Sequence, residues 1–144
     1  MKNLGVFDKT LEKTGQWVES VAHEIGSTDH ERSFQVLRAV LHALRDRLPP
    51  DEAVHLGAGL PMLLRGLYYE SWHMGSKPEH YRHLEPFMEH IARDLPGLDR
   101  TQLERATTAV FCVMQERIGG GITQRVRHCL PEELRDFWPP PVVA

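Results

Sequence analysis

The sequence has few cysteines, and it lacks the patterns that several classes of protein require. Only Cys112 and Cys129 occur among 144 residues. Both lie in stretches typical of buried helix, so we expect free thiols in a reducing compartment rather than a disulfide framework. No run approaches the roughly 18 apolar residues that span a bilayer. Residues 1–17 carry scattered charges instead of the apolar core of a secretory signal. We therefore expect a soluble, cytoplasmic protein without membrane contact.

Excess positive charge and strand patterns are also missing. The formal net charge is −3, so nothing draws the chain broadly toward phosphate backbones, and we do not expect it to bind nucleic acid. No segment shows sustained alternation of apolar and polar residues between turn signals, which argues against a sheet. Hydrophobic residues make up 41% of the chain and charged residues 26%, a composition typical of a folded globular domain.

The chain repeats itself at a distance of seventy residues. Residues 17–68 align with 87–138 without a gap, and ten of the 52 pairs are identical. Many of the remaining pairs keep their apolar character, as in Trp17/Phe87 and Tyr68/Trp138. An internal duplication is the simplest explanation.

Each copy reads as four helices. In the first copy, an apolar stripe ends at Gly26, and Asp29 is placed to cap a longer helix over about 30–48 with a wide apolar face. Pro49-Pro50 ends that helix and begins a short third one. The second copy follows the same plan. Gly97 and Asp99 end its first helix and begin its second, and the glycines at 119–121 separate its second and third helices.

The stretches LPMLLRGLYY from Leu60 and LPEELRDFW from Leu130 predict the fourth helix of each copy. Proline suits the first helical position because the N–H that it lacks has no partner there. The aromatic residues that follow each start are expected to close the core. They are Tyr68, Tyr69, Trp72, Phe137 and Trp138.

These patterns predict one all-α domain over residues 1–138, a pseudo-symmetric helical bundle of two fused four-helix repeats. The first repeat covers about 8–72, a connector covers 73–85, and the second repeat covers 86–138, with Pro86 at its start. A proline-rich tail follows at 139–144. Because a repeat that cannot bury its apolar face alone needs its neighbour, we expect neither half to fold separately.

Three stretches carry a resemblance to a known family: the first copy from VLRAVLHALRDRLPP to LYYESW, the KPEHYRHLEPF connector, and the diverged second copy that ends LPEELRDFW. On these stretches the chain resembles a bacterial family catalogued as domain of unknown function 2267. The likeness extends over nearly the whole chain. The resemblance implies an all-helical fold with an internal repeat and assigns no reaction, cofactor or catalytic residue.

Nine histidines are many for this length, and four of them lie within residues 73–90. Imidazole is a common metal ligand. His80 and His83 stand three residues apart, and His73 and Glu79 lie close by in the sequence. These residues are the candidates for a divalent transition metal, against the alternative that they are ordinary polar residues of a connector. His42 and His55 are conceivable tetrapyrrole ligands, but no CxxCH motif accompanies them.

Catalytic patterns are weak. No GxSxG or HExxH motif occurs, and Cys112 lies among apolar residues that would raise the pKa of its thiol. The glycines at 119–121 have no Walker lysine after them. Arg38, His42 and Arg45 share a helical stripe that we interpret as a solvated face rather than a patch for an acidic partner. We expect no enzymatic activity and no cofactor.

The leading hypothesis is a non-enzymatic accessory protein that binds a protein partner, or a second copy of itself, through a helical surface. Met62 and Leu63 are apolar where the second copy has Glu132 and Glu133, so the first copy's last helix either buries more surface or offers it to a partner. Tyr69 and Trp72 are candidates for an exposed rim of that surface. The alternative is a protein that binds metal or a small ligand through the histidine-rich connector.

Overall fold

The computed structural model describes residues 4–140, which form eight α-helices and one short 3-10 helix and contain no strand. This confirms the predicted all-α class. The predicted tail at 139–144 lies mostly outside the described residues. The helices, in chain order, are α1 (Gly5–Ile25), α2 (His30–Arg47), α3 (Pro50–Ala58), α4 (Met62–Tyr69), α5 (Leu84–Asp94), α6 (Arg100–Arg117), α7 (Gly120–Cys129) and α8 (Glu132–Arg135), with the 3-10 helix η1 (Met74–Ser76) between α4 and α5.

The helix bounds follow the seventy-residue spacing. Helices α2 and α6 begin and end seventy residues apart, and so do the starts of α3 and α7 and of α4 and α8. The side chains of Asp29 and Asp99 each accept a hydrogen bond from a backbone N–H in the first turn, of α2 and α6 respectively, as N-cap residues do. Pseudo-symmetry of the two copies in space stays a prediction.

One hydrophobic core joins the helices before and after the connector. Helix α2 packs against α1, α3, α4, α5 and α6, and it contributes Leu37, Leu41 and Leu44 to that core. Phe87 of α5 and Phe111 of α6 belong to the same core. Its side chains therefore come from helices on both sides of the connector.

Arg65 and Arg135, which occupy equivalent places in the two similar stretches, make matching hydrogen bonds. Each guanidinium donates hydrogen bonds to carbonyl oxygens at the end of the preceding helix: Arg65 to Leu60 and Gly57, and Arg135 to Leu130 and His128. These carbonyls have no partner inside their own helix. The prolines stand one position earlier than predicted, because Pro61 and Pro131 are N-cap residues of α4 and α8.

Helix α5 begins at Leu84, two residues before the predicted start at Pro86. The carboxylate of Glu133, on α8, accepts a hydrogen bond of 2.6 Å from the Leu84 backbone N–H. This distant side chain caps the helix and allows the earlier start, which the local sequence does not reveal.

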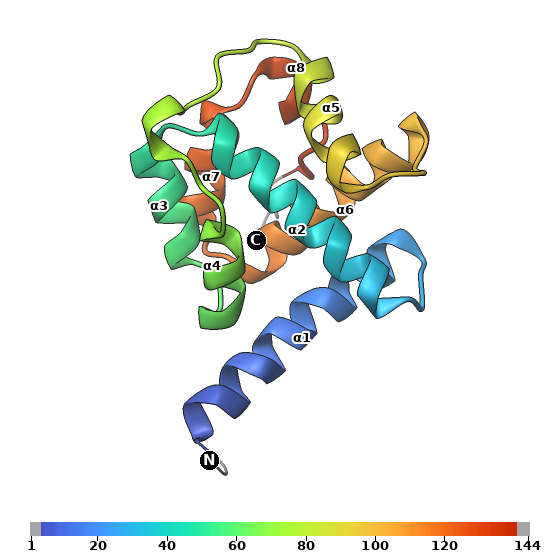
Figure 1. Ribbon diagram of the computed structural model, residues 1–144, viewed down its shortest axis with the longest axis vertical. Coiled ribbons are helices and arrows are strands. Elements are labelled where there is room, and N and C mark those ends of the chain that lie inside the picture. The colour runs from blue at the N-terminus through green and yellow to red at the C-terminus, as the bar shows by residue number, and fades with distance from the viewer. Residues whose placement is uncertain (1–3, 141–144) are drawn as a thin grey trace.

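Figure 1 shows α1 as the longest helix, with its first turns projecting beyond the rest of the bundle. Its second half is held by α2 and α6, which bury Trp17 and Val21. Near the projecting part, the hydroxyl of Thr10 accepts a hydrogen bond from the Leu63 backbone N–H at the start of α4. Among the described residues, no helix is both long enough and apolar enough to cross a membrane.

Candidate functional site

Most of the exposed large hydrophobic side chains lie on α1 and α4, two helices that contact each other. The described part of the chain exposes eight large hydrophobic side chains, and six of them lie in the first turns of α1 or at the start of α4. We call these six residues the α1–α4 surface. They are Leu4, Val6, Phe7, Leu11, Met62 and Leu63.

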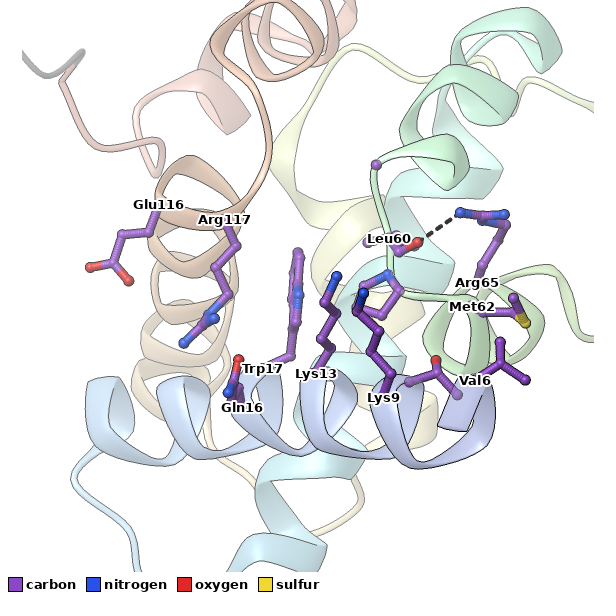
Figure 2. Close-up of a pocket in the computed structure, with 13 residues that line it drawn as sticks. Val6, Lys9, Lys13, Gln16, Trp17, Leu60, Met62, Arg65, Glu116 and Arg117 are labelled. Carbon is purple, nitrogen blue, oxygen red and sulfur yellow. Dashed lines mark hydrogen bonds between the residues drawn. The ribbon is translucent and has the colours of Figure 1, made fainter. Parts of the chain in front are cut away.

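A groove of about 620 Å³ adjoins this surface, and two of the six residues, Val6 and Met62, line it. Val6, Lys9, Lys13 and Trp17 line it from α1, the turn before α4 lines it opposite, and Glu116 and Arg117 close it from the end of α6. Figure 2 shows Lys13 and Trp17 rising from α1 in the same direction, between Arg117 and the start of α4. The groove therefore combines an apolar wall with cationic side chains.

The charge of the groove is opposite to that of the molecule. Four cationic residues line it, namely Lys9, Lys13, Arg65 and Arg117, against the single carboxylate of Glu116, while the whole chain has a net charge of −3. Figure 2 shows Glu116 pointing away from the two lysines. We call this feature the basic groove.

Three of these cations have no acidic partner. Among residues 4–140, no carboxylate lies within ion-pair distance of Lys9, Lys13 or Arg117. The Arg117 guanidinium donates instead to the Ser20 hydroxyl, at 2.7 Å from Nη2. Arg65 caps the end of α3. The positive charge of the groove is thus not neutralised from within the described chain.

Tyr69 and Trp72 lie apart from this surface. Their rings stack with centroids 5.6 Å apart, and both side chains are partly buried against the core. The Tyr69 hydroxyl is 3.4 Å from the Val54 carbonyl oxygen on α3. Of the four residues predicted for an interaction surface, Met62 and Leu63 are exposed, whereas Tyr69 lies against α3 and Trp72 stacks on Tyr69.

A second polar site lies at the end of α2, around Asp46. Its Oδ1 accepts a hydrogen bond of 2.9 Å from Arg45 Nε, and its Oδ2 lies 2.8 Å from His90 Nε2 on α5. Lys77 Nζ lies 4.0 Å from Asp46 and 3.7 Å from Glu79. The Glu79 backbone N–H donates to the Asp46 carbonyl oxygen. These contacts tie the connector and α5 to α2.

The stripe Arg38, His42 and Arg45 is not the solvated face that the sequence predicts. His42 and Arg45 are buried. His42 Nε2 is 2.8 Å from the Leu67 carbonyl oxygen, and Arg45 Nη1 donates to the carbonyl oxygens of Tyr68 and Glu70. The prediction is wrong because the end of α4 covers this face of α2, and its free carbonyls need buried donors.

Burial and hydrogen bonding set the charge states at this site. Burial alone would raise the pKa of Asp46, but the hydrogen bonds from His90 and Arg45 outweigh burial and lower the pKa to about 2. Burial lowers the pKa of His42 despite its bond to the Leu67 carbonyl, so neutral His42 donates from Nε2. Asp46 is therefore a carboxylate wherever the protein is folded near neutral pH.

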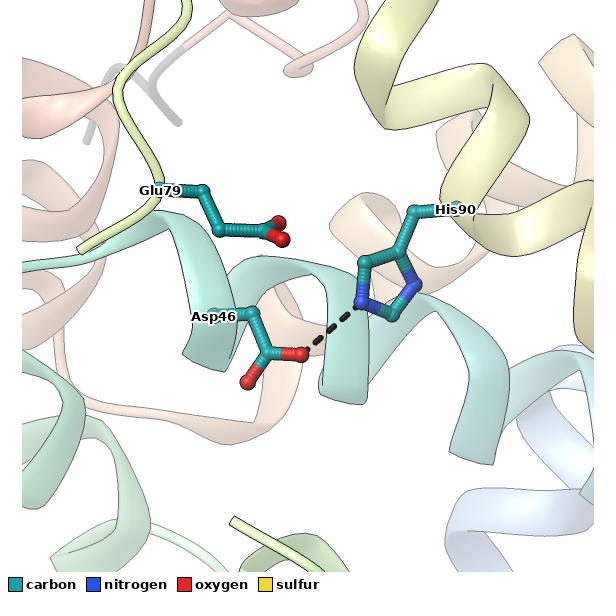
Figure 3. A group of neighbouring side chains, drawn as sticks. All are labelled: Asp46, Glu79 and His90. Carbon is teal, nitrogen blue, oxygen red and sulfur yellow. Dashed lines mark hydrogen bonds and ion pairs between the residues drawn. The ribbon is translucent and has the colours of Figure 1, made fainter. Parts of the chain in front are cut away.

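Figure 3 shows the carboxylates of Asp46 and Glu79 facing the imidazole of His90. One ligand atom from each of the three lies within 4.8 Å of the other two, so they could hold a metal ion. In the structure, however, the charges of Asp46 and Glu79 are already balanced by Arg45 and Lys77. Without a metal ion, these hydrogen bonds and ion pairs already link α2, the connector and α5.

Of the predicted metal ligands, the structure places Glu79 alone in this group. Within the described residues, none of His73, His80 and His83 belongs to a group of three potential ligands. All three are exposed, and His83 lies 3.4 Å from Glu133. Sequence reasoning missed Asp46 because nothing near it suggests that the connector folds back over α2.

The chain matches a family of known proteins. The family described as Uncharacterized conserved protein (DUF2267) matches residues 14–137. No curated protein matches the chain. The first turns of α1, with Leu4, Val6, Phe7 and Lys9, precede the matched residues.

Proposed function

The chain belongs to the DUF2267 family, and because this membership assigns no reaction, we propose from the α1–α4 surface that it is a non-enzymatic cytoplasmic accessory protein that binds a protein partner. The observation that carries the proposal is that six of the eight exposed large hydrophobic side chains lie at the N-terminal end of α1 or at the start of α4, two helices that contact each other. Soluble proteins expose single hydrophobic residues everywhere, but grouped ones mark interaction sites.

The form of α1 supports this function. Leu4, Phe7 and Leu11 recur at spacings of three and four residues, which places them on one side of the helix. The same stripe continues into the second half of α1 as Val18, Val21 and Ile25, where the body of the protein covers it. A bound partner would cover the exposed part of this stripe in the first turns of α1.

Other features speak against an enzyme. Burial raises the pKa of the Cys112 and Cys129 thiols, which disfavours the thiolate that a nucleophile needs. The hydrogen bonds around Asp46 end on backbone carbonyls and on charged partners that hold helices together. They support a structural role for the most polar site.

Matched serine variants test the proposal. Phe7→Ser/Met62→Ser removes two residues of the α1–α4 surface, and Val54→Ser/Met74→Ser removes the two exposed hydrophobic residues outside it. We expect the same partner to co-purify with the wild type and with the second variant, and its recovery to fall about tenfold or more with the first. Equal recovery with all three proteins, or a steady-state turnover abolished by changing a few polar residues, would count against this function.

Binding of a divalent transition metal is the second candidate, favoured by the grouping of Asp46, Glu79 and His90. The ion would replace the ammonium of Lys77, so Lys77→Met should raise its affinity and His90→Ala should abolish binding. His80→Ala/His83→Ala is the control, because both residues lie outside the group. Elemental analysis of untagged protein decides the question: metal lost from the control variant but not from His90→Ala would point to the exposed histidines instead.

A further inference from the structure

We propose that the partner presents an acidic amphipathic helix to the basic groove, with apolar side chains against Val6 and Met62 and carboxylates facing Lys9 and Lys13. This inference rests on the proposed function and adds the chemistry of the partner.

The sign of the charge is the first argument. The groove has four cationic residues against one carboxylate, on a chain whose net charge is negative. Lys9, Lys13 and Arg117 have no ion-pair partner in the described part of the chain. Some cations elsewhere on the surface are paired, as Arg100 is with Glu85 and Arg125 is with Glu52, whereas in the groove three unpaired cations line one depression. A groove with unneutralised cations attracts and orients an acidic partner.

The apolar wall is the second argument, and it selects a peptide over a polyphosphate. Val6 is 50% exposed and Met62 55%, and both line the same groove as the lysines. A nucleic acid backbone would leave these side chains uncovered, and the one aromatic ring in the groove, Trp17, is too buried to stack on a base. An amphipathic segment satisfies the cations and the apolar residues together.

The absence of a sheet edge in residues 4–140 is the third argument. Without an edge, the groove cannot bind an extended peptide by adding a strand. A helix needs no backbone partner, and it presents anchors at spacings of three, four and seven residues.

The test uses three synthetic peptides of about 14 residues, or four helical turns. The first has leucines at helical spacing flanked by glutamates, the second has lysines in place of the glutamates, and the third has serines in place of the leucines. Each is labelled, and its binding to the full-length protein is followed by fluorescence anisotropy. The variant Lys9→Glu/Lys13→Glu reverses the charge at two of the cationic positions in the groove, and we call it the reversed variant. Arg93→Glu/Arg105→Glu is the control, because it makes the same change in net charge at exposed positions outside the groove.

We expect the wild type and the control variant to bind the glutamate peptide at least about tenfold more tightly than either other peptide, with weaker binding at high salt. The reversed variant should lose that preference and favour the lysine peptide. The inference is overturned if the glutamate and lysine peptides bind equally, if the control variant loses as much as the reversed one, or if no glutamate peptide binds at about 1 mM. Displacement of the peptide by a nucleic acid, or by a second copy of the chain as self-association, would also overturn it. In each case the serine variants still decide the proposed function separately, since they test the apolar surface and not the charge.

Discussion

The imidazole of His90 and the carboxylate of Asp46 lie 2.8 Å apart although 44 residues separate them in the sequence. Asp46 lies in the last turn of α2, and His90 lies on α5, so this contact bridges the two halves of the chain. The connector joins it through the Glu79 backbone N–H. Asp46 thus contacts α5 through its carboxylate and the connector through its backbone carbonyl oxygen.

Replacing Asp46 should destabilise the protein strongly. Asp46→Ala leaves the buried guanidinium of Arg45 without its carboxylate, and breaking a buried pair in this way costs about 3–5 kcal/mol of unfolding free energy. Urea denaturation measures the loss. Asp94→Ala is the control, because Asp94 is an exposed carboxylate on α5 and should change stability by less than about 0.5 kcal/mol. Similar losses in both variants would show that the contacts of the Asp46 carboxylate contribute little to the unfolding free energy.

The same carboxylate should make stability depend on acid. The pKa of Asp46 is lowered from 3.8 to about 2 in the folded protein, so the folded state favours the ionised form. The resulting stability is present above pH 3.8 and is lost as pH falls toward 2. By linkage it amounts to about 2 kcal/mol. The difference in unfolding free energy between the wild type and Asp46→Asn should shrink by about this amount as pH falls from about 5 to 2. A constant difference would contradict the shift.

Two helical glycines should respond in opposite ways to alanine. A Cβ at Gly57 would meet the Tyr69 hydroxyl and would lie 3.2 Å from the Tyr68 ring, whereas a Cβ at Gly66 meets nothing within 4 Å. Tyr68 is buried and bonded to the Ala53 carbonyl oxygen, so it cannot move aside easily. Gly57→Ala should therefore destabilise by about 1–3 kcal/mol. Gly66→Ala should stabilise by up to about 1 kcal/mol. Thermal unfolding compares the two, and stabilisation by both would mean that Tyr69 yields without cost.

The helices could be predicted because their signals are local. Gly26 ends α1 with a positive φ of 69°, and Asp29 and Asp99 cap the helices that follow them. Apolar spacing then identifies the buried faces. Met62 and Leu63 could be singled out by comparing the two copies, since their counterparts are glutamates.

The polar site could not be predicted because its contacts are distant in sequence. From the sequence alone, Arg45 is predicted to be a surface residue. The end of α4, which covers it, lies some 25 residues later in the chain. The basic groove is hidden for the same reason. Lys9 and Arg117 come to line one groove only through the packing of α1 on α6. Local patterns therefore identified the elements and one wall of the groove, but not the charges that the fold brings together.

The predicted dependence of each half on the other remains to be tested with the fragment 1–72. Phe87, Ile91, Phe111 and Met114 are fully buried in the same core as α2, and all of them lie after this fragment. Each such side chain contributes about 1.5–3 kcal/mol by burial. Four of them alone approach the 5–15 kcal/mol by which whole domains are typically stable. The fragment should therefore show no cooperative unfolding by circular dichroism. Adding the fragment 73–144 should restore helicity and a cooperative transition in a one-to-one complex, because the missing cover of α2 is then supplied in trans. A monomeric fragment 1–72 with its own cooperative transition would show that the duplicated half is an independent domain.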